Sequence, residues 1–236
     1  MRPVPPCSAS TGPISSISVW RTASSEAVKR DSRPFPPYNL SMNYLMHLHL
    51  SDPTPLVRLG NMMGDFVKGR LEKAPYHPQI IHGLRQHRSI DSFSQVSPAV
   101  NASRERIDPR FGYFRGILID VFYDHFLARN WDRHAEGTLE EFALETYLLL
   151  EEYQHILPEK LQAVAPRMIQ YNWLVSYREV EVMERALIRI GERIKRENPL
   201  AEGYGELLKH YDELEEDSAR FLVEAQRHLQ EKFRST

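Results

Sequence analysis

Two aspartates stand in a strongly apolar stretch that is long enough for more than three helical turns. Between residues 116 and 128, aliphatic and aromatic side chains spread around the whole circumference of a helix, which predicts a buried helix. Asp120 and Asp124 lie one turn apart on it and therefore share one side. Two neighbouring carboxylates that lose their hydration repel each other or take up protons, unless a cation binds them. We interpret this helix, with His125 beside Asp124, as one wall of a metal site.

Further residues with metal-binding side chains precede this helix. His87 and Asp91 are spaced i and i+4 and share a face if the segment is helical. Asp65 follows Gly64, which allows close approach of the backbone. Imidazole and carboxylate together suit Mn²⁺, Mg²⁺, Fe²⁺ or Zn²⁺, and the single cysteine, Cys7, leaves no thiolate site. The predicted metal ligands are Asp65, His87, Asp91, Asp120, Asp124 and His125.

Each of these residues also has a simpler interpretation. Asp65 could cap a helix, and His87 with Asp91 could be an exposed pair that stabilises its helix by a few tenths of a kcal/mol. Two more histidines, His47 and His49, lie in the apolar segment 43–50; they share one side if the segment is extended and lie far apart if it is helical. The predicted catalytic residues are His47, His49 and Asp65, with one of the histidines as a proton donor.

Several arginines lie next to the predicted site in the sequence. One follows His87, and four are interleaved with aromatic residues just before the central helix. Such a cluster is typical of a solvated face, but here it also suits phosphate or an acidic partner. The predicted substrate-binding residues are Arg88, Arg104, Arg106, Arg110 and Arg115.

The pattern predicts an all-α fold, with no convincing alternating strand and no internal repeat. Helices are expected at 56–67, from 78 onward until Ser97-Pro98, at 116–128, 138–155, 168–197 and 207–233, and a capping box at Thr138 and Glu141. We interpret the segment between Pro158 and Pro166 as a short connector. The helices form one compact domain over residues 42–236.

Residues 1–41 differ in composition, because they are rich in Pro and Ser, poor in acids, and lack an apolar period. They predict a disordered leader; a transit peptide and a start at Met42 are the alternatives. The net charge of −2 argues against a dedicated nucleic-acid binder, and no apolar run is long enough for a membrane span. The single cysteine fits a reducing compartment, and we expect a cytoplasmic protein. The oligomeric state has no signal in the sequence.

Several spaced segments, taken together, resemble the acyl carrier protein phosphodiesterases. They are 42–50, 60–69, 87–91 and 120–128 with Trp131, and more weakly 173–178. The resemblance extends from residue 42 to the C-terminus. It implies an all-helical fold distantly similar to the HD-domain metal-dependent phosphohydrolases, although the order Asp124-His125 reverses the dyad of that group.

The resemblance also implies a reaction. It is hydrolysis of the phosphodiester that joins 4′-phosphopantetheine to a serine of holo acyl carrier protein, with Mn²⁺ as the expected cofactor and the carrier protein as partner. Two other readings remain open on the residues alone. One is a metal-dependent phosphohydrolase that acts on a nucleotide or another small phosphoester. The other is a non-enzymatic helical binding module with a structural metal.

Overall fold

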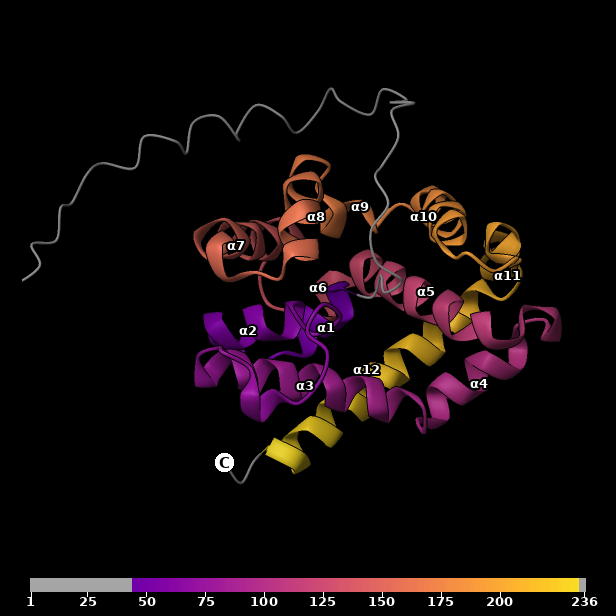
Figure 1. Ribbon diagram of the computed structural model, residues 1–236. Coiled ribbons are helices and arrows are strands. Elements are labelled where there is room, and N and C mark those ends of the chain that lie inside the picture. The colour runs from indigo at the N-terminus through magenta and orange to yellow at the C-terminus, as the bar shows by residue number, and fades with distance from the viewer. Residues whose placement is uncertain (1–43, 234–236) are drawn as a thin grey trace, which may run out of the picture. The chain divides into compact units, whose positions relative to one another are not determined.

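The computed structural model describes residues 44–233, and in this range the chain forms helices and no strands. The helices, shown in Figure 1, are α1 (Tyr44–Leu50), α2 (Pro55–Met62), α3 (Pro78–Ser94), α4 (Pro98–Arg106), α5 (Arg115–Arg129), α6 (Trp131–His134), α7 (Leu139–Glu152), α8 (Glu159–Gln170), α9 (Trp173–Ser176), α10 (Val180–Arg193), α11 (Gly203–Lys209) and α12 (Tyr211–Phe233). Short 3₁₀ segments are η1 (Leu71–Lys73), η2 (Pro109–Phe114), η3 (Gln154–Ile156) and η4 (Leu200–Glu202). The all-α prediction is confirmed, whereas the predictions on residues 1–41 and on Met42 fall outside the described residues.

The central helix α5 is buried, as its sequence predicts. Every residue from Val121 to Ala128 is buried, and α5 packs against α1, α4, α10 and α12 (Figure 1). Burying apolar area contributes roughly 25 cal/mol per Å², so a helix that is apolar on all sides is most stable in the interior. Its position lets Asp124 of α5 reach the first turn of α1.

Helices α2 and α3 cross in close contact because glycines face the partner backbone. A Cβ atom on Gly60 would lie 2.1 Å from the carbonyl oxygen of Ile80, and one on Gly83 would lie 2.0 Å from that of Val57. No side chain larger than hydrogen fits at either position. This crossing places the turn after α2, with Gly64 and Asp65, against the middle of α3.

Polar caps set several helix boundaries. The hydroxyl of Ser97 accepts a hydrogen bond from Val100 N at 3.3 Å, and Pro98 occupies the first turn of α4. Thr138 and Glu141 form the predicted capping box at the start of α7. Such caps bond backbone N–H groups that the helix itself leaves unpaired.

The prediction of a connector between Pro158 and Pro166 is wrong. Pro158 is the residue before α8, and Pro166 lies inside that helix. An interior proline removes one backbone hydrogen bond, but Leu161, Val164 and Met168 form a buried apolar face that outweighs this loss.

Three predicted helices are shorter or divided. The one expected at 56–67 ends at Met62, the one at 168–197 is divided among the end of α8, α9 and α10, and the last divides into α11 and α12. Among the described helices, none is long and apolar enough to cross a membrane. The cytoplasmic location stays a prediction.

Candidate metal centre

Three of the predicted residues, from α1 and α3, meet in one cluster. Nε2 of His47 lies 3.2 Å from Oδ1 of Asp91, and Nε2 of His87 lies 3.3 Å from Oδ2 of the same carboxylate. The two imidazole rings are stacked with centroids 4.0 Å apart. One ligand atom from each of the three residues lies within 4.8 Å of the others. The prediction that His87 and Asp91 share a helix face is confirmed.

The two histidines of α1 have separate surroundings, because the segment is helical. His47 faces α3, whereas His49 contacts the Trp131 ring edge to face at a centroid distance of 5.3 Å. Burial, followed by the charges of His134 and Arg58, lowers the pKa of His49 to about 4. His49 is therefore neutral at physiological pH and lies outside the cluster.

Asp65 adds a second carboxylate beside His87. Its Oδ1 lies 3.5 Å from Nε2 of His87, and its side chain is 15% exposed. The residue before it, Gly64, lies directly under the imidazole, since a Cβ atom there would be 2.0 Å from Cγ of His87. The absence of a side chain at Gly64 is what lets the ring occupy this position.

Asp120 approaches the cluster from α5. With His47 and Asp91 it lines a small cavity of about 10 Å³ that is otherwise mainly apolar. Burial, and then the negative charges of Asp91 and Asp65, raise the pKa of Asp120 to about 8. Without a cation, this carboxyl therefore holds a proton at neutral pH.

The negative charges of Asp65 and Asp91 favour a positive charge at the cluster, and the His87 imidazole supplies it by holding a proton. Burial lowers the pKa of His87, but hydrogen bonds to Asp65 and Asp91 outweigh it and raise the pKa to about 9. Burial raises the pKa of Asp91, yet its contacts with His47 and His87 hold it well below its usual value. Burial and the neighbouring His87 lower the pKa of His47. At neutral pH one imidazolium therefore lies between two carboxylates.

The donor set fits a divalent cation. Nδ1 of His47 and Nδ1 of His87 are buried without a hydrogen-bond partner, and Nε2 of His47 faces only the Asp91 carboxylate at 3.2 Å. Such buried nitrogens are costly unless a ligand or water binds there. The contacts of 3.2 and 3.3 Å lie within the roughly 3.0–3.4 Å between ligand atoms that share an ion at about 2.1 Å, and the 3.5 Å contact of Asp65 is slightly longer. Two imidazoles with carboxylates suit Mn²⁺, Fe²⁺ or Zn²⁺.

Cation affinity is expected to fall as the pH decreases below about 9, because the His87 proton must leave before Nε2 can bind a cation. Below that pH the loss is about tenfold per unit for one competing proton. Isothermal titration with Mn²⁺ from pH 6.5 to 8.5 measures the slope, and His87→Gln should flatten it. Wild-type affinity that does not change over this range would contradict the ligand role of His87.

Asp124 has backbone partners in the first turn of α1. Its Oδ2 accepts a hydrogen bond from Leu45 N at 3.0 Å and its Oδ1 accepts one from Met46 N at 2.8 Å. Burial raises its pKa well above the usual value. Asp124 thus fixes α1 on α5, and it lies outside the cluster of His47, His87 and Asp91.

His125 lies on another side of α5. Its Nδ1 is 2.8 Å from the carbonyl oxygen of Tyr177, which can only accept, so Nδ1 carries the proton. Its Nε2 then accepts from the Tyr211 hydroxyl at 2.6 Å. The two ring nitrogens of His125 thus form hydrogen bonds that join α5 to the segment after α9 and to α12. Because the polar atoms of His125 and Asp124 already have these partners, we leave both residues out of the ligand set proposed below.

Replacing Asp124 by alanine is expected to lower the free energy of unfolding by roughly 2–5 kcal/mol, because two buried N–H groups lose a charged or polar acceptor. The folded fraction should bind Mn²⁺ with wild-type affinity. Chemical denaturation and metal titration measure the two quantities on the same preparation. A loss of metal affinity in fully folded protein would restore Asp124 to the ligand set.

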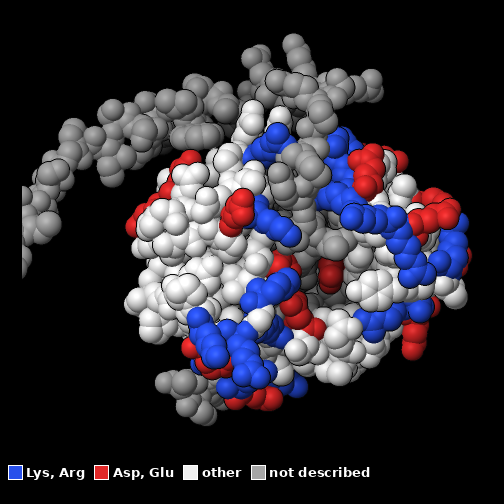
Figure 2. Space-filling model, in the orientation of Figure 1, with Lys and Arg blue, Asp and Glu red and all other residues white. Residues whose placement is uncertain are grey.

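The predicted substrate-binding arginines divide into two groups. Arg106 and Arg110 are paired with acids, at 3.1 Å from Asp217 and 2.7 Å from Glu202. The guanidinium groups of the other three donate to neutral oxygens: Arg88 to Val67 O, Arg104 to Asn101 Oδ1, and Arg115 to Gly112 O and Arg104 O. In Figure 2, acidic side chains gather at a hollow on this face of the molecule, and Lys and Arg side chains gather on several sides of it.

Fold and site together define an all-helical protein with a partly buried His–Asp centre that suits a divalent cation. A model of the acyl carrier protein phosphodiesterase family matches residues 42–225. The chain is 30% identical over 171 residues to the acyl carrier protein phosphodiesterase of Photorhabdus laumondii, covering 72% of this chain and 86% of the relative. It is 33% identical over 182 residues to that of Escherichia coli O45:K1, covering 74% and 90%. The chain therefore belongs to the acyl carrier protein phosphodiesterase family and is a phosphoric diester hydrolase. No solved structure matches it.

Proposed function

We propose that this protein hydrolyses the phosphodiester between 4′-phosphopantetheine and the serine of holo acyl carrier protein. The products are apo carrier protein and free 4′-phosphopantetheine. The observation that carries the proposal is the cluster of His47, His87 and Asp91, with Asp65 and Asp120 beside it, in a member of this phosphodiesterase family.

His47, His87 and Asp91 would hold a divalent cation, Mn²⁺ first, with Mg²⁺ and Fe²⁺ as alternatives, and Asp65 is placed to join them. A cation bound there supplies charge stabilisation at the phosphoryl oxygens and lowers the pKa of a bound water. Because the two imidazoles stack on each other and on Gly64, their nitrogens are held in place before any ligand binds.

The reaction needs one proton acceptor and one donor. Water oxygen bonds to phosphorus while the bond from phosphorus to the serine oxygen breaks, so the water loses a proton and the serine oxygen gains one. Asp65, beside His87, is the candidate acceptor. Asp120 lines the same cavity as His47 and Asp91 but belongs to another helix, and its carboxyl is the candidate donor to the serine oxygen.

Arginines with neutral partners would bind the anionic substrate. Arg88 is adjacent to His87, and Arg104 is close enough to Asp120 for its charge to lower the pKa of that carboxyl. Arg104 and Arg115, which are joined by a hydrogen bond of 3.0 Å, suit the phosphate or an acidic surface of the carrier protein. Docking by charge raises the association rate, so the rate of hydrolysis should fall as salt increases.

The test is a mass assay of holo to apo conversion on purified protein, with metal analysis of the same sample. Mn²⁺, Mg²⁺ and Fe²⁺ are compared after chelation, and a generic phosphodiester and a nucleotide are assayed beside the carrier protein. Conversion that chelation abolishes and Mn²⁺ restores supports the proposal. Hydrolysis of the small substrates without conversion of the carrier protein would refute carrier protein as the substrate. Conversion that chelation does not affect would refute the requirement for a divalent cation.

A further inference from the structure

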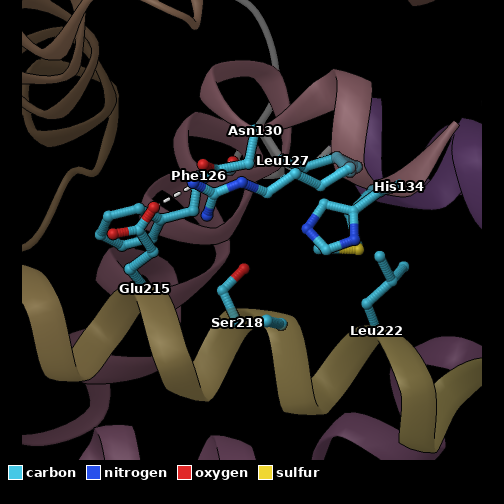
Figure 3. A pocket seen from close by; sticks show the side chains of 10 residues that line it. Phe126, Leu127, Asn130, His134, Glu215, Ser218 and Leu222 are labelled. Atoms are coloured by element: carbon cyan, nitrogen blue, oxygen red, sulfur yellow. Dashed lines mark hydrogen bonds between the residues drawn. The ribbon is translucent and has the colours of Figure 1, made fainter.

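A second, larger cavity lies near the cluster and shares Met46 of α1 with the small cavity. It has a volume of about 160 Å³ and is lined by residues of α1, α5, α6 and α12 together with Asn130 between α5 and α6 (Figure 3). These residues are Met46, Phe126, Leu127, Asn130, Arg133, His134, Glu215, Ser218, Ala219 and Leu222. A cavity of this size holds about a benzene-sized group. None of the roles proposed above uses it.

The large cavity continues the small cavity at the His–Asp cluster. Met46 lines both, as the residue next to His47. On α5, Asp120 and Tyr123 line the small cavity, and Leu127 follows on the same stripe and lines the large one. Seven residues of helix separate Asp120 from Leu127, which is roughly 10 Å along α5. The two cavities therefore follow one face of α5, and Met46 lines both of them.

The lining of the large cavity suits a chain that alternates short apolar segments with amides. Phe126, Leu127 and Leu222 supply apolar walls, and Figure 3 shows the Ser218 hydroxyl pointing into the space with the His134 ring at its side. Ser218 is buried, so its hydroxyl can bond an amide away from bulk water.

The Asn130 amide fixes one wall. It donates to Phe126 O at 3.0 Å and to Glu215 Oε1 at 2.6 Å, and so joins the end of α5 to α12. The charged lining residues differ from the buried imidazoles of the His–Asp cluster, because Arg133 is exposed and Glu215 is half-buried. A neutral ligand of mixed polarity fits this lining better than a phosphate does.

We propose that the large cavity binds the distal, amide-and-thiol end of the pantetheine arm while its phosphate lies at the His–Asp cluster. This inference rests on the proposed function, since it takes 4′-phosphopantetheine as the group removed. The arm has about 13 bonds from phosphorus to sulfur and spans at most roughly 15 Å, at about 3.3–3.6 Å for every three bonds. That length covers the roughly 10 Å from Asp120 to Leu127 and leaves a segment to enter the cavity.

An arm that extends from one cavity to the other would pass Met46, which lines both. The backbone N–H of Met46 is held by Asp124 at 2.8 Å, so the main chain is fixed there. Its side chain has three rotatable bonds and adapts to irregular spaces, as methionine does in general. The arm passes by displacement of this side chain, and no backbone movement is required.

The test fills the cavity and compares a long with a short ligand. Ala219→Phe places a ring in the cavity, and Ser218→Ala removes the hydroxyl. Ala163→Phe, at an exposed position of α8, is the matched control. Affinities for free 4′-phosphopantetheine and for inorganic phosphate are measured by titration calorimetry with Mn²⁺ present, alongside hydrolysis of holo carrier protein and thermal unfolding.

We expect Ala219→Phe to lower the affinity for 4′-phosphopantetheine tenfold or more and Ser218→Ala to lower it severalfold. The affinity of both variants for inorganic phosphate should not change, and Ala163→Phe should bind both ligands like the wild type. Undiminished binding of 4′-phosphopantetheine by both folded cavity variants overturns the inference, even if the wild type hydrolyses carrier protein. Arm binding that depends on the cavity, in a protein that fails to hydrolyse carrier protein, upholds the cavity and overturns the proposed function. If Ala219→Phe does not fold, Ser218→Ala decides.

Discussion

Asp91→Asn is expected to reduce hydrolysis of holo acyl carrier protein about 10³-fold or more, since a catalytic cation supplies several kcal/mol and each 1.36 kcal/mol is a factor of ten. Asp91 contacts both imidazoles, through Oδ1 to His47 and Oδ2 to His87. The asparagine keeps the shape but cannot carry the negative charge. Metal content should fall in parallel with the rate.

Asp91 also suits this test because its side chain is 52% exposed, so the substitution should leave the fold intact. Asp132→Asn, at an exposed position of α6, is the matched control and should retain wild-type activity. The mass assay on carrier protein gives the rate, and circular dichroism confirms folding. Wild-type activity in folded Asp91→Asn would remove this carboxylate from the proposed centre.

Local spacing predicts the parts of the site that lie within one helix. The i and i+4 positions of His87 and Asp91 are sufficient to place both on one face of α3. In the structure the distance from Nε2 of His87 to Oδ2 of Asp91 is 3.3 Å. The apolar circumference of residues 116–128 likewise predicts the burial of α5. In both cases helical periodicity alone carries the information.

Periodicity does not reveal which partner a buried group finds. Asp120 and Asp124 share a stripe of α5, yet one lies at the small cavity and the other holds backbone N–H groups 78 and 79 residues away in sequence. His47 contacts α3 and His49 contacts Trp131, because their segment is helical. The i, i+2 spacing alone does not decide whether the segment is helical or extended. The large cavity has no sequence signal, because its walls come from four helices.

Pro166 shows that tertiary packing can override a strong local signal in the sequence. Pro166 alone argues for a helix end. The apolar face of α8, with Leu161, Val164 and Met168 buried, makes continuation of the helix more favourable than its interruption. Such decisions depend on which surface is available for packing, which a local pattern does not contain.

Gly64→Ala is expected to lower activity by about 10²-fold or more, because a misplacement of about 1 Å in a catalytic group can have that effect. The new Cβ would lie 2.0 Å from Cγ and 2.4 Å from Nδ1 of His87, where ordinary contact needs at least 3.4 Å. The ring must therefore move by more than 1 Å. It cannot move toward His47, whose ring is already stacked on it at 4.0 Å.

The same crowding is expected to cost about 1–3 kcal/mol of stability, as overpacking in a core does. Gly116→Ala is the matched control, since a Cβ at that position of α5 meets nothing within 4 Å. Alanine there should retain activity and stabilise the helix by up to about 1 kcal/mol. Mn²⁺ affinity should fall in Gly64→Ala and not in Gly116→Ala. If folded Gly64→Ala binds Mn²⁺ and hydrolyses carrier protein like wild type, the position of the His87 ring does not limit the reaction, and the proposed ligand geometry is refuted.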